Sequence, residues 1–271
     1  MKKITLILLV LIGVSACKTS PFTGKKTLNF VSNDQLFPMA FQQYDSFLSE
    51  NNVVTGTAES QMVKRVGEKI AVAAERYLTA LGEPGYLNDY RWEYNLVKDD
   101  AINAWCMPGG KIVVYTGILP VTQSEKGLAM VMGHELAHAL ADHGAQRMSA
   151  SQLQQGGALL TAVAVGGQDA QKQNQIMQLY GIGTTVGGML PFSRSHETQA
   201  DEIGVVIAAI AGYDPYEAAN LWRRMKSASG GAGQPQLLST HPTPDSRIAN
   251  LTRMAPIAVQ EAKKFGVTSF K

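Results

Sequence analysis

Cysteine, unbalanced charge and long apolar runs are all scarce in this sequence. Two cysteines among 271 residues, Cys17 and Cys106, are too few for a disulfide-stapled scaffold. Basic and acidic residues nearly balance, at 24 against 22, and no basic run is long enough to indicate a nucleic-acid-binding surface. With five histidines and no histidine-rich tract, the chain is also a poor candidate for metal storage or transport.

No apolar run is long enough to cross a bilayer as a helix, which takes about 20 residues. The run from Ile4 to Val14 is much shorter and follows Lys2 and Lys3, as the apolar segment of a secretory signal does. Such a signal directs a protein for export. We therefore expect residues 1–16 to be a signal peptide.

The sequence VSAC, residues 14–17, looks like a bacterial lipobox. It predicts cleavage before Cys17 and diacylation of the Cys17 thiol; the alternative is an ordinary signal cut near Ala16, with Cys17 incidental. Lys18 after the cysteine, rather than an aspartate, favours the outer membrane over retention at the inner membrane. If Cys17 carries lipid, Cys106 has no partner within the chain, so a buried thiol or a pairing between chains is expected there.

The histidines that are present include the motif His134-Glu135-Leu136-Ala137-His138, in a segment expected to be helical. Residues four apart share one face of a helix, so His134 and His138 can present ring nitrogens to one metal ion. Glu135 can reach a metal-bound water without being a ligand, as a general base would. The alternative is a helix with two surface histidines, but the surrounding run LAMVMGHELAHAL is too apolar for a solvated face.

A catalytic zinc needs a third protein ligand, and the candidate is Glu197 on a second expected helix. Asp201 lies one turn further along that helix and can accept a hydrogen bond from a ligand histidine, which fixes its tautomer. The alternative is an ordinary acidic first helical turn, favoured by the helix dipole. Beside the histidine motif, ligation is the stronger interpretation.

These residues carry a resemblance to a known family. HELAHALADHG, followed by ETQAD, resembles the gluzincin metallopeptidases of the CAAX-prenyl-protease type, and within them the small bacterial lipoprotein branch (LoiP-like). The segments NAWCMPGGKIVVYTGIL and STHPTPDSRI are similar to further motifs of that family, in the same order. The resemblance covers roughly residues 55 to 265.

The resemblance implies that zinc, one ion per chain, is held by His134, His138 and Glu197, with Glu135 as the catalytic base. It also implies quality control of bacterial envelope proteins. The multi-span membrane domain of the eukaryotic prenyl proteases is absent from the sequence, so their prenylated substrates are not expected here. One departure from the family pattern is Trp105, which stands where a smaller aromatic residue such as Phe is expected.

The pattern predicts an α+β fold: a mostly helical, zincin-type metallopeptidase domain with a small β-sheet beside the zinc-motif helix. We divide the chain into a signal peptide (1–16), a lipidated Cys17 with a tether (17–32), and one domain (33–271). The expected elements of the first half are helices near 33–50 and 57–81, strands at 91–98 and 111–115, a loop at 103–110, and a zinc-motif helix opened by a Thr122–Glu125 capping box.

The zinc-motif helix is expected to run to about Asp142, with Gly144 as its cap. The stretch 150–190, rich in Gly, Ala and Gln, is predicted to form two closely packed helices on or near the zinc-motif helix; a mobile lid is the alternative. Pro191 should precede the Glu197 helix, and Asp214-Pro215 should start another. A loop over 229–244 and two short helices complete the prediction.

Two features bear on substrate. The strand KIVVY (111–115) or the adjoining Asn103-Ala104 segment would offer an open edge to an extended peptide; alternatively, KIVVY is an interior strand. His241 and Arg247 are candidates to stabilise the oxyanion of the reaction. His241 has two alternatives: it binds the metal in a resting state, or it only packs against Pro242.

The leading hypothesis is a zinc endopeptidase that is lipid-anchored in the bacterial envelope, faces the periplasm and degrades unfolded envelope proteins. The alternative is a non-cleaving, zinc-containing, chaperone-like lipoprotein that assists outer-membrane protein assembly. Glu135 argues against the second hypothesis, because a purely structural site has no use for that carboxylate. The expected partners are misfolded proteins and a membrane, not nucleic acid; the sequence leaves the oligomeric state open.

Overall fold

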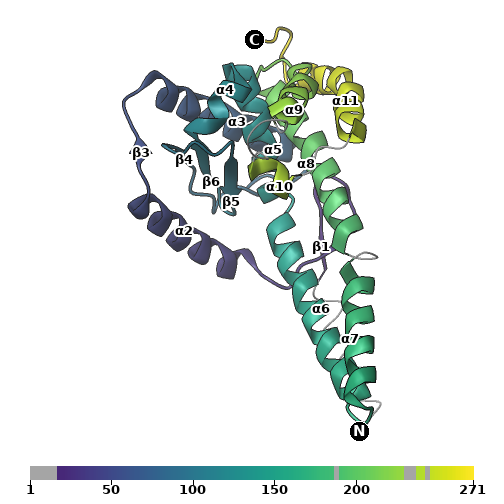
Figure 1. Cartoon of the computed structure of the whole chain (residues 1–271). Coiled ribbons are helices and arrows are strands. Elements are labelled where there is room, and N and C mark those ends of the chain that lie inside the picture. Colours follow the sequence, from purple (N-terminus) through teal and green to yellow (C-terminus); the bar gives the residue numbers. More distant parts are fainter. Residues whose placement is uncertain (1–16, 186–188, 229–235, 242–244) are drawn as a thin grey trace. The chain divides into compact units, whose positions relative to one another are not determined.

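The computed structural model describes residues 17–185, 189–228, 236–241 and 245–271 (Figure 1). The chain forms two compact units. The first, which we call the hairpin unit, comprises Met1–Asn33 and Asp142–Glu197; the second, the sheet unit, comprises Asp34–Ala141 and Thr198–Lys271. The mostly helical α+β fold with a small sheet is confirmed. The proposed signal peptide lies outside the described residues, and the division into signal, tether and single domain stays a prediction.

The sheet unit contains a four-stranded sheet in the order β3-β4-β6-β5. These strands are β3 (Val53–Val54), β4 (Glu93–Val97), β6 (Lys111–Tyr115) and β5 (Ala104–Met107). β4 and β6 run parallel, and the other neighbours are antiparallel. Every residue of β6 is buried, as expected for β-branched residues in a central strand. KIVVY is therefore an interior strand, and β5 forms the edge next to it.

The loop predicted for 103–110 is wrong in its first half, where β5 forms. β5 pairs with β6 through Cys106 opposite Ile112 and Met107 opposite Lys111. The tight return needs positive φ at Gly109 (84°) and Gly110 (88°), which glycine adopts without steric cost. Because these glycines allow a tight turn between Met107 and Lys111, residues 104–107 can pair with β6 as a strand instead of forming a loop.

Helices of the sheet unit cover this sheet. They include α2 (Asn33–Glu50) and α3 (Ala58–Ala80), close to the predicted bounds, and α5 (Glu125–Leu140), which carries the histidine motif. α3 packs on β4 and α5, and α5 packs on β5. The predicted Thr122–Glu125 capping box is wrong. Thr122 ends the short helix α4 (Leu119–Thr122), and Ser124 caps α5 by accepting from the Gly127 amide.

The end of α5 also differs from the prediction. α5 stops at Leu140 instead of Asp142, and Gly144 lies inside the next helix rather than capping α5. Asp142 adopts the left-handed conformation, with φ 55°. A short acidic side chain tolerates this conformation next best after glycine, so Asp142 takes the position that Gly144 was expected to fill.

The remaining helices are α8 (Leu190–Ile210), α9 (Glu217–Ala228), α10 (Gln236–Thr240) and α11 (Asp245–Lys264). The predicted start at Asp214 is close, since the Asp214 carboxylate accepts the Tyr216 amide just before α9. Two predictions are wrong: α10 forms within the expected loop, and one 20-residue helix replaces the two short ones. α11 continues past Pro256 because its apolar face, which includes Leu251, Ala255 and Ala258, is buried without interruption.

α5 and α8 approach each other through glycine. A Cβ atom built on Gly204 would lie 2.8 Å from backbone atoms of Gly133 and His134. Neither backbone can give way, so this crossing tolerates only hydrogen at position 204. The crossing sets α8 directly against the first histidine of the motif.

The hairpin unit has fewer elements. β1 (Cys17–Thr19) pairs antiparallel with β2 (Lys26–Leu28), so the region predicted as a tether contains a short β-hairpin. β2 packs on α6 (His143–Val165), which lies alongside α7 (Ala170–Thr184) as predicted for this stretch. The Phe30 amide donates to the Ser149 hydroxyl over 2.9 Å. Among the described helices, none has the length and apolar character needed to cross a membrane.

Candidate metal centre

α5 brings His134, Glu135 and His138 together in a buried position. Their exposed fractions are 2%, 4% and 6%, and every residue of α5 from Gly127 to Leu140 is buried. The Nε2 atoms of the two histidines lie 3.2 Å apart, one helical turn from each other. Two imidazoles whose nitrogens converge in an apolar interior need a partner for those nitrogens, and a metal ion supplies one.

A carboxylate and a third imidazole complete the group. One ligand atom from each of His134, His138, Glu197 and His241 lies within 4.8 Å of all the others. Glu197 is the last residue assigned to the hairpin unit, and α8 carries it one turn before Asp201 of the sheet unit. The three ligands implied by the resemblance are thus close enough to hold one ion, and the nitrogen and oxygen donors suit zinc.

Glu135 carries the atom that best tests whether a metal fits. Its Oε1 is buried and has no hydrogen-bond partner among the described residues, and the nearest ion-pair contact is to Nε2 of His241, at 3.7 Å. A buried carboxylate oxygen without a hydrogen-bond partner is energetically costly, so a bound water or substrate group is expected to donate to it. A water activated at the metal would donate to this atom.

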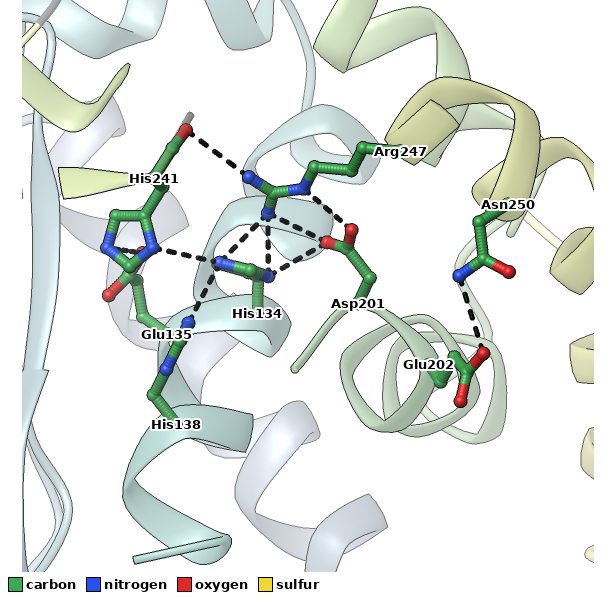
Figure 2. Close-up of polar contacts among 8 residues, drawn as sticks. All are labelled: His134, Glu135, His138, Asp201, Glu202, His241, Arg247 and Asn250. Carbon is green, nitrogen blue, oxygen red and sulfur yellow. Dashed lines mark hydrogen bonds and ion pairs between the residues drawn. The ribbon is translucent and has the colours of Figure 1, made fainter. Parts of the chain in front are cut away.

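Asp201 is the outer carboxylate that the sequence predicted. Its Oδ1 lies 3.0 Å from Nδ1 of His134, and Arg247 contacts both oxygens, Nε at 2.6 Å and one Nη at 2.8 Å (Figure 2). Burial alone would raise the pKa of Asp201, but Arg247 and the bond from His134 outweigh it and hold the pKa below its usual value. The ionised carboxylate therefore accepts a hydrogen bond from Nδ1–H of His134. This leaves Nε2 of His134 unprotonated and able to ligate a metal.

Arg247 lies at the centre of these contacts. It is 5% exposed, and its guanidinium carbon lies 3.6 Å from the centre of the Trp222 ring. Its other terminal nitrogen donates to the main-chain carbonyl of His241 over 3.3 Å (Figure 2). Arg247 therefore ties Asp201 to the segment that carries His241, besides contacting the His134 ring.

His241 follows α10 and places its ring beside both motif histidines. Ring centres lie 5.1 Å from His134 and 4.9 Å from His138, and Nδ1 lies 3.4 Å from Nε2 of His134. This position suits either an oxyanion donor or a metal ligand. The third alternative involved Pro242, which lies outside the described residues.

The predicted substrate residues lie at the start of the edge strand. Ala104 is buried and pairs with Val114, while the Asn103 carbonyl accepts the Tyr115 amide over 3.1 Å. β5 has no strand partner on its outer side among the described residues, and α5 packs against it. An open sheet edge therefore lies next to the helix that carries the metal motif.

Cys106 lies in the same strand, and its thiol stays protonated. Burial, followed by the nearby charge of Glu135, raises its pKa well above the usual value. Metal binding and nucleophilic attack both require the thiolate. Neither role is therefore assigned to Cys106.

Two further histidines form a separate pair in the hairpin unit. The rings of His143 and His196 stack with centres 4.0 Å apart, and Nε2 of His196 lies 3.1 Å from Oε1 of Gln146. Burial, then the neighbouring His143 and Arg147, lowers the pKa of His196 to about 3, so its ring is neutral. Parallel rings cannot direct their nitrogens at one ion. The pair therefore serves packing.

Trp222 is the residue that sequence reasoning missed. Besides contacting Arg247, its ring meets His134 edge-on at 5.5 Å. In the sequence it reads as one more buried position of the segment EAANLWRRM. No pattern in one chain shows that this tryptophan meets an arginine 25 positions later.

Comparison with known proteins places these motifs in context. The model of peptidase family M48 matches residues 57–255, which include all four members of the metal group. The mitochondrial metalloendopeptidase OMA1 of Schizosaccharomyces pombe is 32% identical over 246 residues, covering 88% of this chain and 66% of the relative. The human metalloendopeptidase OMA1 is 28% identical over 274 residues, covering 94% and 49%.

A bacterial relative is similar over a shorter range. The β-barrel assembly-enhancing protease of Escherichia coli is 32% identical over 184 residues, covering 64% of this chain and 37% of that protein. The chain thus spans less than two thirds of the length of each of these relatives.

Proposed function

The chain belongs to peptidase family M48, and on this premise we propose that it is a zinc-dependent endopeptidase. The observation that carries the proposal is the buried group of His134, His138, Glu197 and His241, next to the unsatisfied Oε1 of Glu135. His134, His138 and Glu197 would hold the ion. When bound, zinc supplies a Lewis acid that acidifies water and polarises a carbonyl.

Glu135 then moves the proton. Its buried Oε1 accepts a proton from the attacking water and later delivers it to the leaving amine. Asp201 keeps His134 in the tautomer that presents Nε2, and Arg247 keeps Asp201 ionised. His241 would donate to the developing oxyanion.

A second role of His241 is equally compatible with its position. Because its ring nitrogen belongs to the four-atom group, it would fill the fourth ligand position in a resting enzyme. Substrate would then have to displace the ring before water can enter. Replacing His241 separates the two roles. Loss of activity indicates that His241 donates to the oxyanion, and a gain of activity indicates that it is a metal ligand that blocks the resting enzyme.

The substrate is proposed to be an extended, unfolded polypeptide. The outer edge of β5 offers main-chain donors and acceptors, so a peptide would add to the sheet as another strand. Asn103 and Ala104 stand at the beginning of that edge. Main-chain pairing is tolerant of sequence, which suits an enzyme that degrades misfolded proteins.

The proposed place of action is the bacterial envelope, with Cys17 lipidated at the periplasmic face of the outer membrane. The VSAC sequence supports it, as does the resemblance to the LoiP-like branch of the CAAX-prenyl-protease type. The Escherichia coli relative is named for β-barrel assembly, whereas the yeast and human relatives are named as mitochondrial proteins. The non-cleaving, chaperone-like lipoprotein is the second candidate.

One experiment tests the enzyme directly. Residues 17–271 are purified, with Cys17→Ser to prevent acylation; bound zinc is measured, and casein is digested with and without a chelator. Glu135→Gln should keep zinc and lose cleavage, while Glu125→Gln, on the same helix, should keep both. Zinc without cleavage of any unfolded protein would favour the chaperone-like candidate, and full activity in Glu135→Gln would eliminate the assigned base.

A further inference from the structure

The hairpin unit carries an apolar surface that the peptidase chemistry does not use. Seven of the 13 exposed large hydrophobic side chains in the described chain lie on α6 and α7. On α6, Leu159, Leu160 and Val163 are the most exposed of these side chains, at 67%, 72% and 73%. Contiguous exposed apolar side chains on a folded protein usually mark a surface that binds something.

These three residues share one face of α6. Their spacing of one, three and four positions places them on the side away from α7, together with Gly156. Residues 148–168 contain no charged side chain at all, and neither do residues 173–193. We call the outward face formed by Gly156, Leu159, Leu160 and Val163 the α6 face.

The two units carry opposite net charge. From residue 17 onward, the hairpin unit has six basic and three acidic residues, whereas the sheet unit has 16 basic and 19 acidic residues. The excess positive charge therefore belongs to the unit that carries the α6 face. An apolar face on a cationic unit, with an anionic unit elsewhere in the same chain, is complementary to a surface of anionic lipid.

The N-terminal strand belongs to the same unit. β1 begins at Cys17, and its partner β2 packs on α6. A lipid on Cys17, as proposed above, would hold this unit at a membrane. A groove of about 380 Å³ between α6, α7 and the start of α8 also has no charged residue in its lining, which includes Leu153, Tyr180 and Phe192.

We propose that the hairpin unit is a membrane-docking element, whose α6 face enters the headgroup region of an anionic lipid surface. In this arrangement the helix lies in the plane of the membrane, with its apolar face toward the acyl chains. Leu159, Leu160 and Val163 contact acyl chains, while basic residues beside β2, which packs on α6, meet the headgroup phosphates; these include Lys25 and Lys26. The inference rests on the proposed function in one respect: the proposed location in the bacterial envelope supplies the membrane that the α6 face would bind.

The test uses protein that cannot be acylated. Residues 17–271 with Cys17→Ser are sedimented with vesicles of pure phosphatidylcholine, and with vesicles that also contain phosphatidylglycerol. Binding is expected to the anionic vesicles and should weaken as salt is raised, because the headgroup attraction is screened. Replacing Leu159, Leu160 and Val163 together by Gln should weaken binding by at least about tenfold, through the lost apolar contact.

A matched control comes from the sheet unit. Val72, Leu81 and Ile257 are also exposed, at 58%, 40% and 40%, and replacing them by Gln removes three exposed aliphatic side chains from the other unit. This control should bind vesicles like the parent. Circular dichroism melts of both triple variants establish that each is folded, which is expected because none of the six side chains is buried.

Three results would overturn the proposal. These are no binding of the parent to anionic vesicles, equal binding by the two triple variants, and a parent that self-associates through the α6 face instead of binding lipid. The readout does not depend on hydrolysis. An inactive parent that still binds vesicles therefore refutes the peptidase alone, and an active parent that ignores vesicles refutes the docking alone.

Discussion

α5 and α6 are separated by two residues and are both built from aliphatic and small side chains, yet they have opposite surroundings. α5 is buried on every side from Gly127 to Leu140, whereas the second half of α6 is exposed around most of its circumference. Composition alone therefore does not decide burial. The difference lies in neighbours: β5, α3, α4 and α9 pack on α5, and α8 crosses it at Gly204, whereas the second half of α6 has α7 on one side.

The first way to break this comparison is to remove one histidine from each helix. His138→Ala should lower zinc affinity by more than the roughly 10–100-fold typical of outer-shell changes, because it deletes a ligand. His143→Ala should keep zinc and instead cost about 2 kcal/mol of unfolding free energy, since a fully buried stacked ring is lost. Zinc titration and urea unfolding of both variants check this pair. Equal zinc loss in the two would contradict the assignment.

Replacing a glycine by alanine in each region should change the free energy of unfolding in opposite directions. Gly204→Ala places a methyl group 2.8 Å from the α5 backbone and should destabilise the fold by about 3 kcal/mol. Gly156→Ala, on α6, meets no atom within 4 Å and should stabilise by about 0.5–1 kcal/mol, through helix propensity. Urea midpoints of the two variants should move in opposite directions. A shift in the same direction would mean that α5 and α8 do not cross as described.

The next effect concerns the carboxylate behind α5. Asp201→Asn keeps the shape of the side chain but removes the charge that holds His134 and Arg247, so zinc affinity should fall by about 10–100-fold. Glu202→Gln, the next residue on α8, is the control and should leave affinity unchanged. Competition with a zinc-binding dye measures both variants. An unaltered affinity in Asp201→Asn would show that His134 needs no outer carboxylate.

The smallest effect lies at the start of α5. Contacts from Arg65 lead the interactions that lower the pKa of Glu125 to about 2, and the Tyr213 hydroxyl contributes. Because the folded pKa is below the unfolded value near 4.3, this stabilisation is complete above about pH 4.3 and is lost as pH falls toward 2. The pair is partly solvated, so its contribution is about 1 kcal/mol. Glu125→Gln should flatten the acid limb of stability against pH by that amount; an identical acid limb would show that the carboxylate contributes nothing.

Sequence reasoning reached the metal group because the chemistry is local to each helix. The spacing of His134 and His138, and of Glu197 and Asp201, is a property of one helical turn. The strand KIVVY and the helices near 33–50 and 57–81 were likewise predicted from periodicity within a short window.

Long-range contacts explain what sequence reasoning missed. Nothing near Trp222 reveals that Arg247 lies over its ring. The cap of α5 is a local contact, but Thr122 and Ser124 are both favoured capping residues, and the pattern alone does not choose between them. The single helix α11 depends on how its apolar face is covered, which outweighs the break expected at Pro256. The edge position of β5 follows from the order of strands in the sheet, which no single segment contains.

The contact between Gly133 and Gly204 has a consequence for how this protein tolerates change. His134 directly follows Gly133, and Asp201 precedes Gly204 by less than one helical turn. The distance between the His134 ring and the Asp201 carboxylate therefore depends on position 204 having no Cβ atom. In a library of all amino acids at position 204, only the parent glycine should preserve zinc affinity. The same library at position 156 should yield mostly working enzyme.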